Sequence, residues 1–269
     1  MVSGGLLACF GAVLGWWLGT GIILWLNHLP RHTLRWSLAA ATALLLLALA
    51  ALPSLSQDTS GRGLALAFVA ALVIWGWLEL SYLSGLVTGP RRGPCPPAAS
   101  TWQRFCLGVQ TTLYHELLML ALVATTFALT RDAPNRVTAW CCVILWLLRW
   151  SAKLNLFLGV SNFNAHWLPE RLQYLGSYIR RRRMNGLFPL SLLSGGAATA
   201  LLFAAAFGAP AGFERDSLLV LASLLFLGVL EHAFLMLPVR DSELWQWALP
   251  GDNRARKAAL AEREQGRRS

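Results

Sequence analysis

The chain has 269 residues, of which 56% are hydrophobic and only 13% are charged. Soluble globular proteins usually carry about 25% charged residues, so this composition excludes an ordinary water-soluble fold. The net charge of +10 would suit a nucleic-acid-binding protein, but the basic residues lie between long apolar blocks instead of along one soluble face. Their natural partners are anionic lipid head groups. We therefore predict a membrane protein that contacts lipid and no nucleic acid.

Seven apolar blocks follow one another along the chain. Each approaches the length of about 20 residues that a helix needs to cross a bilayer. We predict an all-α, polytopic bundle with seven transmembrane spans, in residues 4–26, 36–55, 64–88, 106–129, 138–160, 187–207 and 217–238. Residues 1–240 would form the bundle, and residues 241–269 a cytoplasmic interfacial segment with a basic tail.

Lysines and arginines are distributed unevenly between the predicted loops. The loops after the first, third and fifth spans and the C-terminal tail together carry 17 of them, whereas the other loops carry 4. The positive-inside rule places the basic loops in the cytoplasm. We therefore expect the N-terminus outside and the C-terminus in the cytoplasm. Because the bias alternates from loop to loop, it also supports an odd number of spans.

Arginines gather in two of the predicted cytoplasmic loops. We predict that these arginines contact lipid or a partner protein: Arg91, Arg92, Arg180, Arg181, Arg182 and Arg183. Apolar residues recur every three or four positions between Leu168 and Ile179, which predicts an interfacial helix over about residues 168–183. Its C-terminal arginines would suit the negative end of the helix dipole. The alternative is that these arginines only fix the topology.

Small and aromatic residues indicate further packing. Gly11, Gly15 and Gly19 form a row in the first span that lets another helix approach closely. That helix belongs either to the bundle or to a partner protein. After the last span, Trp245 and Trp247 are typical of an anchor at the membrane interface.

Polar residues inside the spans are the candidate functional residues, because burying charge in a bilayer is costly. These residues come from four spans and comprise Glu79, His115, Glu116, Arg149, Lys153, Asn155, Glu231 and His232. By their depth, the ionisable ones lie between the midplane and the cytoplasmic face. Three glutamates face one arginine and one lysine, which is close to neutral and predicts a mutually paired network.

Four interpretations of this polar layer stay open. In the first, it locks the helices together through buried ion pairs. In the second, His115 or His232 is an axial ligand of a metal or of a magnesium tetrapyrrole such as bacteriochlorophyll. In the third, adjacent His-Glu pairs form a metal or acid–base centre, although neither the Glu-x-x-His spacing nor a His-Glu-x-x-His motif is present. The fourth is a proton or ion pathway. We assign no metal site and no catalytic residue.

Longer motifs resemble a known family. They include WGWLELSYLSG at residues 75–85, YHE at 114–116, RWSAKLN at 149–155 and LEH at 230–232, with further matches at 87–92, 174–178 and 180–184. Together they span essentially the whole chain and resemble the PuhE family, the photosynthetic complex assembly proteins of purple and related phototrophic bacteria. This family has no settled enzymatic activity, so the resemblance supplies no catalytic residues.

The resemblance implies a multi-pass protein of the bacterial cytoplasmic or intracytoplasmic membrane. It implies a non-enzymatic role in building the reaction centre and the core light-harvesting complex, or in supplying bacteriochlorophyll to them. The implied partners are subunits of these complexes and other assembly proteins. The alternatives are a membrane-embedded metal-dependent enzyme of pigment or lipid metabolism and a transporter. The enzyme would be centred on His115, Glu116, Glu231 and His232.

Overall fold

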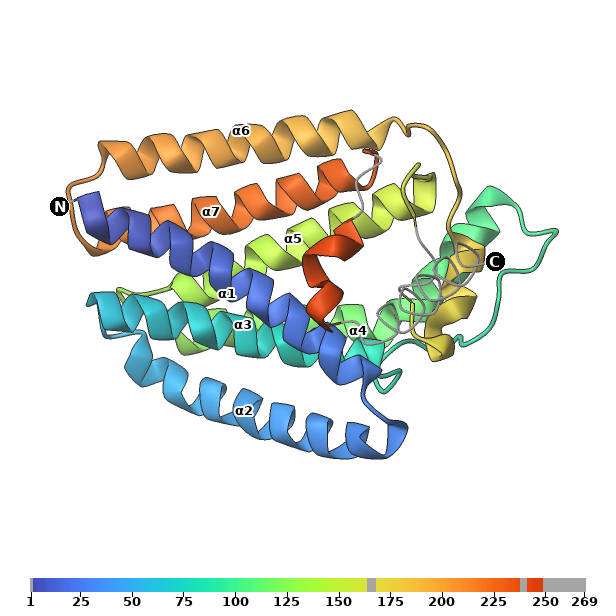
Figure 1. Cartoon of the computed structure of the whole chain (residues 1–269), viewed down its shortest axis with the longest axis horizontal. Coiled ribbons are helices and arrows are strands. Elements are labelled where there is room, and N and C mark those ends of the chain that lie inside the picture. Colours follow the sequence, from blue (N-terminus) through green and yellow to red (C-terminus); the bar gives the residue numbers. More distant parts are fainter. Residues whose placement is uncertain (1, 164–167, 238–240, 249–269) are drawn as a thin grey trace, which may run out of the picture.

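The computed structural model describes residues 2–163, 168–237 and 241–248 (Figure 1). Within them lie seven helices that are long and apolar enough to cross a membrane. They are α1 (Val2–His28), α2 (Leu34–Leu55), α3 (Gly61–Leu83), α4 (Thr101–Leu129), α5 (Val137–Leu158), α6 (Leu187–Gly208) and α7 (Phe213–Phe234). Short 3₁₀ segments are η1 (Arg31–Thr33), η3 (Glu170–Tyr178) and η4 (Asp241–Ala248). The predicted all-α, polytopic bundle is confirmed.

The long helices run up and down, so that successive loops lie at alternate ends of the bundle (Figure 1). Helix α3 packs against α1, α2 and α5, while α7 packs against α1, α5 and α6. Helices α2 and α6 lie on the outside (Figure 1). We call the end that carries residues 29–33, 84–100, 159–163 and 168–186 the basic end, because the loop arginines predicted to face the cytoplasm lie there.

Two span boundaries differ by five residues from those expected from hydropathy. Helix α3 ends at Leu83, five residues early, because Gly85 adopts a positive φ of 75° and the Val87 N–H donates back to the Ser81 carbonyl at 3.0 Å. Helix α4 begins five residues earlier than expected, at Thr101, behind a capping box formed by the preceding residue. Hydropathy detects the apolar part of a helix, whereas caps and turns set its ends.

The glycine row of α1 makes only one close helix contact. A Cβ at Gly15 would lie 3.0 Å from the Phe68 ring of α3, whereas a Cβ at Gly11 or Gly19 would meet nothing within 4 Å. Residues four apart differ by about 40° around a helix, and α1 approaches α3 at Gly15 alone among the three. Packing within the bundle therefore holds for Gly15 and not for the other two. Their packing against a partner stays a prediction.

The predicted interfacial helix over residues 168–183 is too long. Only η3 (Glu170–Tyr178) is helical, and the backbone becomes extended at Ile179. Beyond it, the Arg182 N–H donates to the Val160 carbonyl, and the Val160 N–H donates to the Arg180 carbonyl, each at 3.2 Å. The backbones of Arg180 and Arg182 therefore pair with the chain that leaves α5. Because η3 ends at Tyr178, its last turn contains none of the arginines that were expected to complement a helix dipole.

The segment η4 lies along α1 instead of at its end. The Trp245 ring meets Trp16 edge-on at 5.7 Å, and the Trp247 ring lies 5.6 Å from Trp17. The Trp17 indole N–H donates to the Leu244 carbonyl at 3.0 Å. Trp16 and Trp17 occupy the middle of α1, so η4 packs against the middle of that helix. Anchoring of the η4 tryptophans at the membrane interface stays a prediction. The predicted basic tail, residues 251–269, lies outside the described residues.

Candidate functional site

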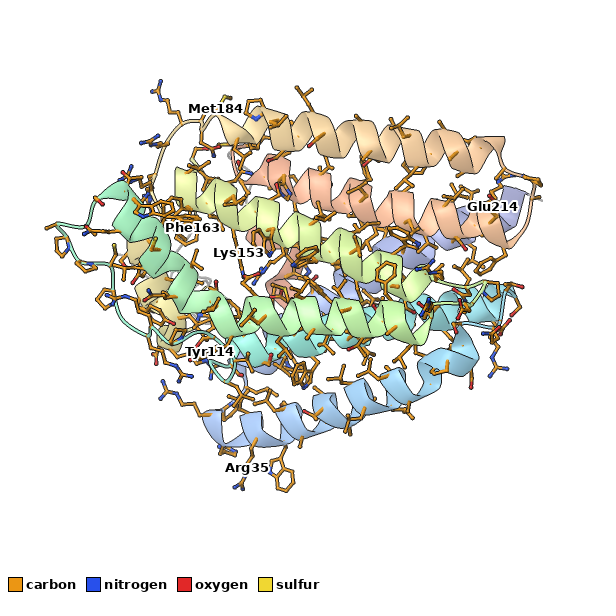
Figure 2. The ribbon with its side chains drawn as sticks, turned by 180° about the vertical axis from the view of Figure 1, so that it is seen from behind. Arg35, Tyr114, Lys153, Phe163, Met184 and Glu214 are labelled. Carbon is orange, nitrogen blue, oxygen red and sulfur yellow. The ribbon has the colours of Figure 1, made fainter. Side chains whose placement is uncertain are left out.

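Two ion pairs join three helices in the half of the bundle nearest the basic end. The Arg149 guanidinium of α5 lies 2.9 Å from the Glu79 carboxylate of α3. One turn further along α5, Lys153 contacts the Glu116 carboxylate of α4. Residues four apart share one helix face, so α5 directs both cations inward, and Figure 2 shows Lys153 between α5 and α4. The structure thus brings four of the predicted polar residues together.

Tyr82 lies at the centre of this cluster. Its ring is 5.6 Å from the Arg149 guanidinium carbon and 5.3 Å from the Lys153 ammonium nitrogen. It also stacks on the His115 ring, with centroids 4.6 Å apart and planes tilted by 32°. Cations are attracted to aromatic rings at such distances. Sequence reasoning did not single out Tyr82, although it follows Glu79 by three residues and so shares its helix face.

Helix α4 changes direction near Tyr114, as Figure 2 shows. There the His115 backbone N–H donates to the Thr88 carbonyl of the preceding loop at 3.0 Å. Gly89 presses against the same turn, and a Cβ on it would overlap the Gln110 carbonyl oxygen. Insertion of a foreign group into the helical hydrogen-bond ladder is a known cause of kinks. The loop that follows α3 therefore positions His115 against Tyr82.

A cavity of about 700 Å³ lies beside the cluster. Its walls come from α1, α2, α3, α5, α7 and η4, and most of them are leucine, isoleucine, valine and tryptophan side chains. The ionisable residues on its walls are Glu79, Arg149, Glu231 and His232. Binding sites for small molecules and cofactors usually measure about 300–1,000 Å³ and combine apolar walls with a few polar groups. This cavity has both properties.

The two predicted site residues of α7 lie on this cavity wall. Glu231 interacts electrostatically with Arg149 and so extends the charged cluster to a fourth helix. His232 is buried, and its Nδ1 lies 2.7 Å from the Gly228 carbonyl oxygen. Because a carbonyl only accepts, Nδ1 carries the proton and Nε2 keeps its lone pair. That Nε2 is covered by neighbouring atoms and has no hydrogen-bond partner in the described structure.

The remaining two predicted polar residues behave differently. Both ring nitrogens of His115 are buried without a hydrogen-bond partner among the described residues, and His115 does not line the cavity. Asn155 lies away from the charges, where its amide donates to the Ser191 hydroxyl of α6 at 3.0 Å and to the Ser151 carbonyl. Asn155 therefore joins α5 to α6 and is not brought to the ion pairs.

Several arginines at the basic end hold loops together. The Arg91 Nε donates to the Tyr178 hydroxyl at 2.7 Å, and the buried Arg104 donates to the Tyr178 carbonyl at 3.1 Å. Arg171 donates to the last carbonyl of α3 at 2.8 Å. Burial lowers the pKa of the Arg171 guanidinium from its ordinary value, and nearby Arg31 lowers it further. Residues 84–104 and 171–186 contain no acidic side chain, so this surface is strongly positive.

Comparison with known proteins gives a family and a relative. Residues 1–256 match a family model described as a protein of unknown function (DUF3623). The chain belongs to the DUF3623 family. A Rhodobacter capsulatus protein, named an uncharacterized 30.4 kDa protein in the puhA 5' region, is 38% identical over 247 residues, which make up 87% of each chain. No solved structure matches.

The residues of the metal-enzyme alternative do not converge in this DUF3623 protein. In the part of the chain that the structure describes, no three His, Cys, Asp or Glu side chains come close enough to hold one metal ion. His115 stacks on Tyr82, while Glu116 pairs with Lys153. The geometry gives more support to a ligand-binding cavity bordered by ion pairs.

Proposed function

We propose that this protein is a membrane assembly factor for the photosynthetic reaction centre and its core light-harvesting complex. It acts by holding or handing over a hydrophobic component, with bacteriochlorophyll the leading candidate. The observation that carries the proposal is the cavity of about 700 Å³ among membrane-spanning helices, with a charged cluster on its wall. An apolar molecule dissolved in the bilayer can reach such a site without crossing water.

The genetic setting of the relative supports a photosynthetic role. The Rhodobacter capsulatus relative is named for the puhA 5' region, which is a reaction centre gene region of a phototroph. The motifs that resemble the PuhE family agree with that setting, and they include the ion-pair residues Glu79, Glu116, Arg149 and Lys153. Accordingly, the protein resides in the cytoplasmic or intracytoplasmic membrane, with its basic end in the cytoplasm.

Of the two candidate ligands of a pigment, His232 fits better than His115. His232 lines the cavity, and its Nε2 lone pair is directed by the Nδ1 contact to Gly228. An imidazole oriented in this way by its other nitrogen is well suited to ligate a metal. Bacteriochlorophyll would supply its magnesium ion to Nε2 once the atoms that cover this nitrogen move aside. His115 lies under Tyr82, outside the cavity.

The basic end is the proposed contact surface for partners and lipids. Arg92 and Arg181 to Arg183 extend the loops whose other arginines hold the fold together. A surface of this charge attracts anionic lipid head groups and acidic patches on nascent subunits. A handover at this end would occur next to the charged cluster, because both lie in the same half of the bundle.

The proposal is tested by deleting the gene and recording absorption spectra of the membranes. We expect the reaction centre and core antenna to fall well below the wild-type amount, and a plasmid copy of the gene to restore them. Wild-type amounts of both complexes and of bacteriochlorophyll in the deletion strain would overturn the proposal. The same spectra report pigment supply separately, because free pigment and assembled complexes absorb differently.

A further inference from the structure

We infer that the cavity binds an uncharged, lipid-soluble molecule with carbonyl or ester oxygens at one end of a long apolar body, and that Arg149 donates hydrogen bonds to those oxygens. The inference rests on the proposed function, since it names the class of ligand held in the same cavity. Isoprenoid quinones, esterified tetrapyrroles and neutral glycerides share this chemistry. They are distinguished by the experiment below.

Arg149 is a hydrogen-bond donor on the cavity wall. A guanidinium has five N–H donors and cannot be deprotonated in a protein. One terminal nitrogen of Arg149 contacts Glu79, while the Nε is buried without a hydrogen-bond partner among the described residues. Although helices surround it, 29% of the Arg149 side chain is accessible, and it lines the cavity. Because the Nε is covered, the donors that remain for a ligand are the terminal N–H groups that Glu79 does not take.

The charge of the cavity wall favours a neutral ligand. Glu79 and Glu231 line the cavity together with Arg149, and Lys153 is already paired with Glu116. The cavity wall therefore carries two carboxylates beside one guanidinium. An anionic head group would add negative charge where two carboxylates already stand. A neutral oxygen acceptor satisfies the Arg149 donors without that repulsion.

The remaining walls of the cavity are mostly apolar. Away from the charges, the lining consists of apolar side chains such as Leu18, Ile22, Leu72 and Val73 from α1 and α3. The cavity also reaches residues of α2, on the outside of the bundle, and Trp245 of η4 forms part of its wall. An elongated apolar body fits this space, with its oxygen-bearing end at Arg149.

Two glycines of α1 provide a matched pair of variants. Gly19 lines the cavity, whereas Gly11 does not, and a Cβ at either position would meet nothing within 4 Å. Gly19→Phe should fill the cavity while leaving the helix contacts intact. Gly11→Phe adds the same side chain to the same helix outside the cavity. A third variant, Arg149→Lys, keeps the positive charge beside Glu79 but removes the planar set of donors.

The experiment is gentle purification of the full chain and its three variants from native membranes. Bound molecules are extracted and identified by absorption and mass spectrometry. We expect one neutral, carbonyl-bearing class near one molecule per protein. Its occupancy should fall at least tenfold in Gly19→Phe, fall severalfold in Arg149→Lys and stay unchanged in Gly11→Phe. The identity of the molecule tells a quinone from a tetrapyrrole ester or a glyceride.

Empty proteins are then titrated with decylubiquinone, bacteriochlorophyll a and radiolabelled dioleoylglycerol. Quenching of tryptophan fluorescence reports binding of the first two probes, and retained radioactivity reports the third. Saturable binding of one probe that Gly19→Phe abolishes supports the inference. An anionic phospholipid as the bound species, equal occupancy in Gly19→Phe and Gly11→Phe, or no saturable binding of any probe would overturn it. A deletion strain with normal complexes would overturn the assembly role while leaving a positive binding result intact, so the two failures are distinguishable.

Discussion

Arg149 and Lys153 leave α5 on the same face, and each meets a glutamate from a different helix. The depth and spacing of these residues are visible in the sequence, so a paired layer could be predicted from it. Which glutamate pairs with which cation could not be predicted, because this depends on how α3 and α4 are oriented relative to α5. Tyr82 could not be identified as a site residue from the sequence for the same reason. A tyrosine in an apolar span becomes informative only when His115 and two cations are found around its ring.

Glu116→Gln tests the second ion pair. The substitution leaves the Lys153 ammonium without a carboxylate inside the bundle, and breaking a buried pair in this way typically costs roughly 3–5 kcal/mol. We expect a clear drop in the thermal unfolding temperature in detergent. The double variant Glu116→Gln/Lys153→Met should recover much of the loss, because the unpaired charge is removed. A double variant no more stable than Glu116→Gln would contradict the pairing.

At the scale of elements, two segments depart from simple hydropathy. The loop after α3 inserts backbone into α4 at His115, and η4 lies against the middle of α1. Each arrangement depends on one glycine. No repeating pattern in the sequence predicts which glycine this is. Gly89 lets the loop touch the α4 backbone, and Gly21 makes room for the Trp247 ring. Such long-range backbone contacts leave no local pattern, so the sequence predicted the spans and not these insertions.

Gly89→Ala tests the contact that accompanies the α4 bend. The added methyl group would overlap the Gln110 carbonyl oxygen, so the loop or the helix must shift. Overpacking of this kind costs about 1–3 kcal/mol, which should appear as a lower unfolding temperature in detergent. Gly93→Ala, in the same loop, is the control, since a Cβ there meets nothing within 4 Å. Equal stability of the two variants would argue against the contact.

Gly21→Ala tests the packing of η4 against α1. A methyl group at this position would overlap the Trp247 indole, so we expect η4 to move off α1. Tryptophans released from this contact should emit at longer wavelength, and the C-terminal segment should be cleaved faster by protease. Gly19→Ala changes the same helix without meeting any atom within 4 Å. Identical spectra and cleavage rates for the two variants would contradict the observed position of η4.

At the scale of the whole molecule, seven spans and an alternating arginine bias predict one orientation. The structure gathers the arginine-rich loops at the basic end, and the positive-inside rule places that end in the cytoplasm. Reporter enzymes that are active only outside the cytoplasm, fused at Asp58, Asp132 or Ala209, should be active. Fusions at Gly93 or Gly186 should be inactive. The reverse pattern would overturn the orientation and the proposed cytoplasmic handover.

The central claim is that the cavity serves assembly of the photosynthetic complexes, and one measurement tests it most directly. The chromosomal gene is replaced by Gly19→Phe or by Gly196→Phe, whose site in α6 lies outside the cavity and has nothing within 4 Å of an added Cβ. The membranes are compared by absorption spectroscopy at equal amounts of the protein. We expect Gly19→Phe to lose reaction centre and core antenna as the deletion strain does, while Gly196→Phe keeps wild-type amounts. Wild-type complexes in Gly19→Phe cells, beside a defective deletion strain, would contradict the claim.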